Sequence, residues 1–378
     1  VRILRTQKHS KHLSKSRLEC YSKFSNIQGL LIEYFLLSLR NQFHIRLLFS
    51  GFTISQKVTS LRMAIMGAGA LGSLYGGMLA EAGEDVVLIK RSEDHVDAIN
   101  SRGLQISGVR GDRVIKAKAT TDPKTVGQVD LIFFMVKSFH TEEAAMDCLP
   151  MVGTDTTILT LQNGVDNAEK IGNVVGREKV MAGSSTQNAV FIKPGHVHHA
   201  MEGTTIIGEM NGSITNRARR ISQVLNNAGI KTEISSNILG VLWTKLLLAV
   251  SVIPLNAVTD LSPAEMIQIP ELKDVMTKVV QEAVNVASAA GIRFAVEEPI
   301  SWFLEFDQFK QREYTRGYKA SMRQDIERGQ KTEIEAFNGL LVRKGKQFGV
   351  PTPHNETLLG IIKGIERKSI SLKKQFEN

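Results

Sequence analysis

The stretch MAIMGAGALGSLYGGMLAEAGEDVVLIKR, residues 63–91, decides the fold of this chain. The apolar run 64–66 predicts a strand, and a glycine-rich turn follows it. Apolar residues then recur at helical spacing over 71–79, so one face of a helix would pack on a sheet. The next apolar run, 86–89, predicts a second buried strand. The order strand, turn, helix, strand is that of a parallel α/β unit.

Gly67, Gly69 and Gly72 give the turn a G-x-G-x-x-G spacing. In a dinucleotide site these glycines permit, in order, a tight turn, the approach of a pyrophosphate to the backbone, and close packing of helix on strand. The helix start then offers free N–H groups and the positive end of a dipole to the phosphates. Because the spacing lies between two predicted strands, it favours a dinucleotide-binding, Rossmann-type fold over a chance glycine turn.

The residues that end the second strand bear on the choice of cofactor. A site for NAD usually has Asp or Glu here, which holds the ribose 2′-hydroxyl. This chain has Lys90, Arg91 and Ser92 instead. Arg pairs with phosphate oxygens through two parallel hydrogen bonds, so these residues favour the 2′-phosphate of NADP(H). A solvated basic turn, with Glu93 and Asp94 beside it, is the alternative.

The formal charge of +9 comes from one end of the chain. Residues 1–62 contain 11 of the 47 basic residues but only two of the 38 acidic ones, so the remaining residues carry no net charge. The body of the protein therefore lacks the basic surface expected of a nucleic-acid-binding protein.

The basic head, residues 1–62, has no place in the α/β pattern. Its apolar patch at 30–39 is short and interrupted by Glu33, so we expect no membrane span there. An organelle transit peptide has this composition, and so does translated sequence upstream of a true start, since Met63 lies at the first strand. We expect an extension that is not part of the fold.

Cysteine and histidine give no disulfide or metal pattern. Cys20 and Cys148 are too few for a disulfide framework and have no metal-ligand spacing, which suits a reducing compartment such as the cytoplasm. His196, His198 and His199 follow period-two spacing on a predicted strand, where we expect surface positions rather than metal ligands.

The rest of the chain divides into a mixed part and a helical part. We expect strands over 130–136, 156–161, 180–186, 204–208 and 230–234, a hairpin of 104–106 with 114–119, and helices over 94–101, 141–149 and 217–228. From Ser236 on, only helical patterns occur, over 237–255, 271–290, 302–318, 321–330 and 332–348. We therefore expect a Rossmann domain over 63–235 and an all-helical domain over 236–378.

Few side chains in these elements indicate chemistry without further information. Lys245 lies in an otherwise apolar helix, so its ammonium must either extend outward to solvent or point into a polar cleft. Asn163 follows a predicted strand at its carboxyl end, where open α/β sheets bind ligands. Ser321 and Glu333, by themselves, are ordinary residues of a helix surface and a helix start.

The chain resembles the ketopantoate reductase family (2-dehydropantoate 2-reductase). The matching segments run in family order over residues 63–365: GAGALG at 67–72, KR at 90–91, VKS at 136–138, LQNG at 161–164, PG at 194–195, WTKL at 243–246, SMRQDIERGQKTEIEAFNG at 321–339 and GVPTP at 349–353. The resemblance implies the same two domains, the second being 6-phosphogluconate dehydrogenase C-terminal-like, with the active site in the cleft between them.

The resemblance also implies roles for single residues. Lys245 matches the catalytic lysine, whose ammonium would hydrogen-bond the 2-oxo oxygen and protonate the alkoxide formed by hydride arrival. Glu333 matches the acid near the nicotinamide ribose and the substrate, and it would orient Lys245 or bind a hydroxyl. Asn163 matches an asparagine that contacts cofactor and substrate, and Ser321 matches a substrate-binding serine.

The cofactor contacts implied by the resemblance lie in the first domain. Lys137 matches a residue near the adenine or phosphates of NADP(H), Arg91 matches another cofactor contact, and Ala189 matches a backbone contact. The glycine turn supplies the others: Gly67, Ala68, Gly69, Ala70, Leu71 and Gly72.

The chain departs from the family where the substrate would bind. The family has asparagines four and eight residues after the lysine, where this chain has Ala249 and Ile253. Each missing hydrogen bond to a charged group is worth about 1.5–3 kcal/mol. The resemblance therefore implies an NADPH-dependent reductase of 2-dehydropantoate, with a more apolar 2-oxo acid as the rival substrate.

Other readings stay open at this point. A non-catalytic NADPH-binding protein would keep the fold, although retention of both Lys245 and Glu333 argues against it. We expect a small-molecule 2-oxo acid as the partner, in the cytoplasm, with no nucleic acid and no membrane, and the oligomeric state, including a homodimer, is left open.

Overall fold

The computed structural model describes residues 61–306 and 318–377. The basic head lies outside the described residues, apart from its last two positions. The same holds for residues 307–317, most of the helix predicted over 302–318.

The stretch 63–91 folds as predicted. Strand β1 (Arg62–Met66), helix α2 (Ala70–Glu81) and strand β2 (Asp85–Ile89) follow one another, and the two strands pair in parallel with Met63 opposite Val86. Leu74 and Met78 of α2 are fully buried against the sheet. The helical spacing of its apolar residues therefore decides which face of α2 packs.

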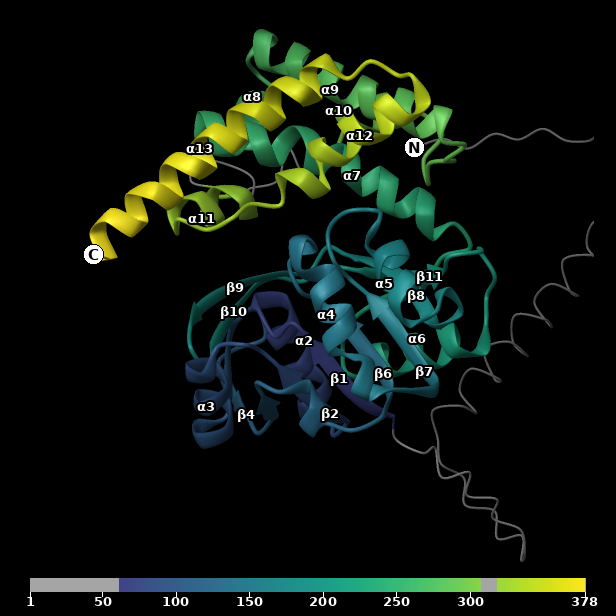
Figure 1. Cartoon of the computed structure of the whole chain (residues 1–378), viewed down its shortest axis with the longest axis vertical. Helices are drawn as coiled ribbons and strands as arrows, with labels where there is room; N and C mark the ends of the chain where they lie inside the picture. The colour runs from purple at the N-terminus through teal and green to yellow at the C-terminus, as the bar shows by residue number, and fades with distance from the viewer. Residues whose placement is uncertain (1–60, 307–317, 378) are drawn as a thin grey trace, which may run out of the picture. The chain divides into compact units, whose positions relative to one another are not determined.

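An eight-stranded sheet forms the centre of the first half (Figure 1). Its order is β12-β11-β8-β7-β6-β1-β2-β5, and all neighbours are parallel except β11 against β8. The further strands are β5 (Lys118–Thr120), β6 (Val129–Phe134), β7 (Val152–Thr160), β8 (Val180–Ser185), β11 (Thr205–Glu209) and β12 (Thr232–Ile234). The chain runs outward from β1 to β2 and β5 and then returns to β6 on the other side, so the sheet has a switch point between β1 and β6.

Helices cover the sheet, and its central strands bury side chains on both faces. Ala64 and Ile132 belong to one apolar core, whereas their neighbours Ile65 and Phe133 belong to the other. The covering helices besides α2 are α3 (Glu93–Arg102), α4 (Thr141–Asp147), α5 (Asn167–Val175) and α6 (Asn216–Asn227). Burial on both faces explains why the run 131–136, which follows the exposed Asp130, is continuously apolar.

A second, four-stranded sheet corrects two predictions. It has the order β4-β3-β10-β9, from β3 (Leu104–Gly108), β4 (Arg113–Ile115), β9 (Asn188–Lys193) and β10 (His196–Met201). The single strand predicted over 114–119 is wrong, because β4 pairs with β3 while β5 joins β2 in the larger sheet. The predicted surface position is also wrong for His199. Its side chain is fully buried, and its Nε2 lies 2.8 Å from Gln187 Oε1.

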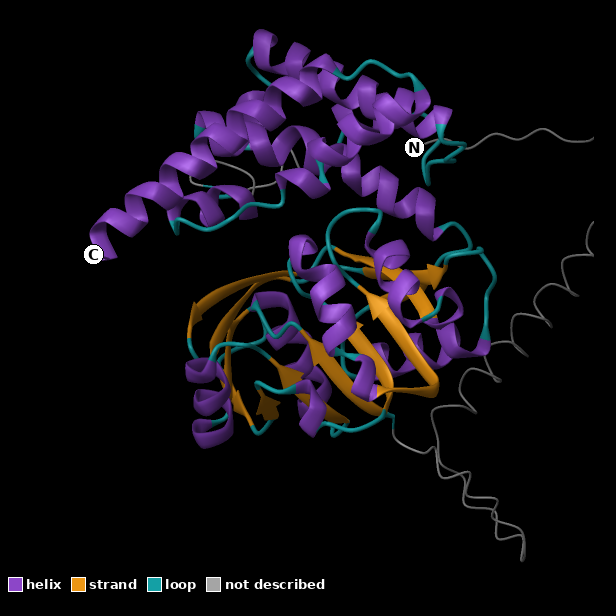
Figure 2. Cartoon of the chain, in the orientation of Figure 1, coloured by secondary structure: helices purple, strands orange, loops and turns teal. Residues whose placement is uncertain are grey.

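The second half contains helices and no strand among the described residues beyond Ile234 (Figure 2). The elements are α7 (Ile238–Thr259), α8 (Pro263–Met266), α9 (Pro270–Ala289), α10 (Pro299–Leu304), α11 (Ser321–Glu327), α12 (Asn338–Phe348) and α13 (Pro353–Glu377). The helix predicted to start at 332 starts at Asn338 instead, and a single 3₁₀ turn, η7 (Ile334–Ala336), precedes it. The predicted pairing of a Rossmann-type sheet with a helical second half is confirmed.

Helix α7 is the central element of the helical half, and its mean hydropathy and length would suit a membrane span, yet most of that window is buried in the protein. It contains Pro254, which has no N–H to donate to the carbonyl of Val250 one turn earlier. The side chain of Asn338 donates to that carbonyl at 2.9 Å and to Asn355 Oδ1 at 3.0 Å. A side chain from α12 thus replaces the hydrogen bond that the proline removes.

We expect Asn338→Ala to lower the free energy of unfolding by about 1–3 kcal/mol, because the Val250 carbonyl would be buried without a donor. The matched control is Asn285→Ala on the exposed face of α9, which should change stability by less than about 0.5 kcal/mol. Urea unfolding of both variants is the measurement. Equal midpoints would contradict the role assigned to Asn338.

Candidate active site

The glycine turn between β1 and α2 has the room and the backbone shape that a pyrophosphate needs. Gly67 has φ +107°, and a Cβ there would lie 2.5 Å from the amide nitrogen of Val136. A Cβ on Gly72 would lie 2.3 Å from the carbonyl oxygen of Gly67, whereas a Cβ on Gly69 would meet no atom within 4 Å. The first and third glycines therefore serve packing, and the second borders open space.

The start of α2 faces that space without a cap. Gly69 is the N-cap, and it offers no side chain to the free amides of the first turn, which includes Ala70 and Leu71 and has no acidic residue. Ala68 lies behind the turn, where its amide donates to the carbonyl of Ile89 at 2.8 Å. Uncapped N–H groups at a helix start are an anion site, so the turn fits a dinucleotide phosphate.

Cations collect at the end of β2. The Arg91 guanidinium lies 3.3 Å from Glu143 Oε2 and 2.8 Å from His140 Nε2, and it is mostly exposed. Lys90 is partly buried, and its ammonium has no hydrogen bond or ion pair to any described residue. Burial, Arg91 and Lys137 all lower the pKa of Lys90. A phosphate dianion at this end would relieve that repulsion, which fits the predicted 2′-phosphate.

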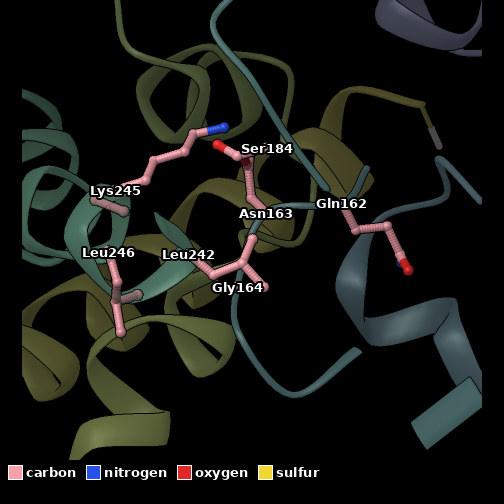
Figure 3. A pocket seen from close by; sticks show the side chains of 8 residues that line it. Gln162, Asn163, Gly164, Ser184, Leu242, Lys245 and Leu246 are labelled. Carbon is pink, nitrogen blue, oxygen red and sulfur yellow. The ribbon is translucent and has the colours of Figure 1, made fainter. Parts of the chain in front are cut away.

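A pocket lies where the carboxyl ends of β7 and β8 meet α7 (Figure 3). Its lining combines three groups from the loop after β7, one from β8 and four from α7: Gln162, Asn163, Gly164, Ser184, Leu242, Lys245, Leu246 and Ala249. In Figure 3 the Lys245 side chain extends toward Ser184, while the Gln162 amide points away. Gln162 instead donates to the Val136 carbonyl at 2.9 Å. The pocket thus joins a strand-end loop to one helix.

Lys245 enters this pocket rather than extending to solvent. Its Nζ donates to the carbonyl oxygen of Ser185 at 2.9 Å. Burial lowers the pKa of Lys245 to about 8, and the negative charge of Glu333 opposes that shift. The amine therefore remains mostly charged at neutral pH, yet it gives up a proton far more readily than an exposed lysine.

Glu333 connects the helical half to the loop after β6. One oxygen accepts the amide N–H of Ser138 at 2.9 Å, and the other lies 3.4 Å from Lys137 Nζ. The same Nζ lies 2.8 Å from Asp325 Oδ2 of α11. Burial alone would lower the pKa of Lys137, but the charges of Glu333 and Asp325 raise it.

Ser185 is itself held from two sides. Its hydroxyl accepts from Tyr75 of α2 at 2.8 Å and from the amide of Gln187 at 3.1 Å. Tyr75 is fully buried, which raises its pKa and keeps it a neutral hydrogen-bond donor. The helix that follows the glycine turn therefore holds the side chain of the residue whose carbonyl binds Lys245.

The predicted site residues are brought together to different degrees. Asn163 and Lys245 line one pocket, and Glu333 acts electrostatically on Lys245. Ser321 is the first residue of α11, which packs on α7, but it does not line the pocket. Ala189 lies in β9 opposite His199, also outside the pocket lining.

Three groups were missed by reasoning from the sequence: the Ser185 carbonyl, Tyr75 and Asp325. A backbone carbonyl leaves no sequence signal, and Tyr75 is one of several apolar positions in α2. The sequence could have indicated Asp325 as a site residue, because it follows Ser321 by one helical turn and so lies on the same face of the helix. No set of three or more histidine, cysteine or acidic side chains in the described part is arranged to hold a metal ion.

Comparison with known proteins gives concordant matches over most of the chain. Residues 63–212 match the family model described as ketopantoate reductase PanE/ApbA, and residues 237–366 match the model of its C-terminal part. A 2-dehydropantoate 2-reductase of Archaeoglobus fulgidus is 33% identical, covering 81% of this chain and 98% of the relative. One of Pyrococcus abyssi is 36% identical with the same coverage.

Solved structures agree with these relatives. A PanE/ApbA family ketopantoate reductase from Ralstonia eutropha has a TM-score of 0.74 at 34% identity, covering 81% of this chain and 99% of that one. The ternary structure of a D-mandelate dehydrogenase with NADH and anilino(oxo)acetate has a TM-score of 0.76 at 28% identity, with the same coverage.

The two glycines of the turn should separate binding from folding. We expect Gly69→Ala to keep the unfolding free energy within about 0.5 kcal/mol and to weaken NADPH binding at least about tenfold, because its Cβ would take the open space. Gly72→Ala should instead destabilise the fold by about 1–3 kcal/mol. Fluorescence titration and thermal unfolding check both, and a destabilised Gly69→Ala with normal affinity would contradict the assignment.

Proposed function

This chain belongs to the ketopantoate reductase family, and from that membership we propose that it reduces 2-dehydropantoate to pantoate with NADPH, a step of pantothenate biosynthesis. The observation that carries the proposal is Lys245, a partly buried ammonium with a lowered pKa on the wall of the pocket. Such a group is what the reduction of a 2-oxo acid requires, because negative charge develops on the carbonyl oxygen as hydride arrives.

In this proposal each residue has a defined task. NADPH, when bound along the glycine turn, supplies the hydride. Lys245 donates a hydrogen bond to the 2-oxo oxygen and then transfers its proton to the alkoxide. An ammonium has three N–H groups, so one can stay on the Ser185 carbonyl while another meets the substrate.

The other predicted site residues orient these partners. Asn163 would contact substrate and cofactor from the loop after β7, and Ser321 would bind the substrate from the start of α11. Glu333 would hold the charge of Lys245. Lys137, Arg91 and the backbone of Ala189 would contact the cofactor.

Oxidation of NADPH by the purified protein, with 2-dehydropantoate and a panel of other 2-oxo acids, tests the function. We expect 2-dehydropantoate to give the highest kcat/KM. No turnover of any oxo acid, together with tight NADPH binding, would overturn the proposal in favour of a non-catalytic NADPH-binding protein.

The pKa of Lys245 sets the expected pH dependence. Because the charged form is the acid, kcat/KM for reduction should be level below about pH 7 and fall tenfold per pH unit above about pH 8. The reverse oxidation needs the neutral amine and should rise through the same pH. Reduction that stays level to pH 10 would exclude Lys245 as the proton donor.

A second substrate class is favoured by the pocket lining. Leu242, Leu246 and Ala249 surround Lys245 on α7, where an asparagine at 249 would offer a polar contact. A larger apolar or aromatic 2-oxo acid would bury its side chain there, and anilino(oxo)acetate, bound by the D-mandelate dehydrogenase relative, is a ligand of that kind.

Ala249→Asn distinguishes the two substrates. If 2-dehydropantoate is native or ancestral, the added amide should raise kcat/KM for it by about tenfold or more. It should lower kcat/KM for an aromatic oxo acid, because a polar group would enter an apolar wall. The matched control is Val258→Asn on the exposed face of α7, which should change neither. A loss for 2-dehydropantoate would favour the apolar class.

We further propose a cytoplasmic enzyme, which is supported by the small number of cysteines, and we expect neither nucleic-acid nor membrane binding. A homodimer is the oligomeric state to test first, by light scattering of the purified chain.

A further inference from the structure

The loop after β6 presents one ammonium to two carboxylates of the helical half. Lys137 Nζ lies 2.8 Å from Asp325 and 3.4 Å from Glu333, and each carboxylate side chain is only 7% exposed. Asp325 makes no other side-chain hydrogen bond with a described residue. A single cation thus faces two buried anions, and the closer anion makes no further side-chain hydrogen bond with a described residue.

Glu333 interacts with two cations. It shares Lys137 with Asp325, and its negative charge also opposes the lowering of the Lys245 pKa by burial. Lys137, Asp325, Glu333 and Lys245 therefore form a charge tetrad of two cations and two anions. Leaving Lys245 aside, the other three members carry a net charge of −1.

We propose that Asp325 is a positioning residue: by pairing with Lys137 it leaves the charge of Glu333 free to hold Lys245 in its ammonium form. The proposal rests on the assignment of Lys245 as the proton donor. This role explains why the site has a second carboxylate. Glu333 alone could neutralise Lys137, but its charge would then no longer stabilise the ammonium of Lys245.

Other charged groups near the tetrad do not replace Asp325. Burial raises the pKa of Asp325, and the positive charges of Lys137 and then of Arg328, just after α11, oppose that shift. Burial, Arg91 and Lys137 lower the pKa of Lys90, so this second cation does not pair with Lys137. Among the charged groups of the described residues, only Glu333 shifts the pKa of Lys245. No charged group on α7 or at the end of β8 does so.

Charge counting predicts opposite effects for two single variants. Asp325→Asn removes one negative charge, so the net charge around Lys245 becomes zero. Lys137 then pairs with Glu333 alone. The basic limb of the pH profile of kcat/KM should move down by about half to one pH unit. Lys137→Met makes the net charge more negative and should move the limb up. The double variant restores −1 and should return the limb to its original pH.

Two further variants serve as controls. Asp325→Glu keeps the charge and should hold the limb within about 0.2 pH units of its original position. Glu327→Gln, at the end of the same helix and paired with Lys319 and Arg323 on the surface, should leave the profile unchanged. If Asp325 were only structural, Asp325→Asn would lower stability or kcat without moving the limb, and the proposal would be overturned.

A direct titration separates this proposal from the proposed function. The ¹³C resonance of methylated Lys245, identified by its absence in Lys245→Arg, reports the pKa of the amine in the substrate-free protein. We expect it to fall in Asp325→Asn, rise in Lys137→Met and return in the double variant, even if no oxo acid is reduced. Shifts of both single variants in one direction, or none, would refute the role of Asp325.

Discussion

The loss of water around the Lys245 ammonium is the constraint on which the site depends. An amine that enters a pocket between a strand end and an apolar helix loses charge unless neighbours compensate for the lost hydration. The Ser185 carbonyl and the charge of Glu333 provide that compensation, and the balance leaves a pKa of about 8. A lysine in this state is charged enough to bind an oxyanion and acidic enough to give up its proton.

The fold brings these compensating groups from distant parts of the chain. The switch point between β1 and β6 places the glycine turn next to the loop that carries Lys137, and α2 supplies Tyr75 to fix Ser185. Helix α7 adds Lys245 from the helical half, and α11 adds Asp325. Glu333 directly precedes η7. Asn338 donates the hydrogen bond to the Val250 carbonyl that Pro254 cannot provide. This bond ties the helix that carries Lys245 to α12.

Local chemistry explains what the sequence could and could not predict. The β1–α2–β2 unit follows from glycine spacing and apolar periodicity, and the structure confirms it to within a few residues. The strand predicted over 114–119 failed because two sheets share a short segment, which periodicity cannot divide. The sequence allowed the Lys245 side chain to extend to solvent or to enter a polar cleft, and the packing of α7 places it in the pocket. The Ser185 carbonyl and the pairing of Asp325 with Lys137 depend on contacts between distant segments, so no local pattern reports them.

The most direct test of this account is the turnover of Lys245→Ala, measured with 2-dehydropantoate and NADPH in a sample whose NADPH affinity is known. Loss of a positioned general acid predicts a decrease in kcat of about a hundredfold or more. The affinity for NADPH should stay near that of the unaltered protein, because Lys245 lies in the pocket and not at the glycine turn. Turnover close to that of the unaltered protein, with normal cofactor binding, would contradict the central role given to this lysine.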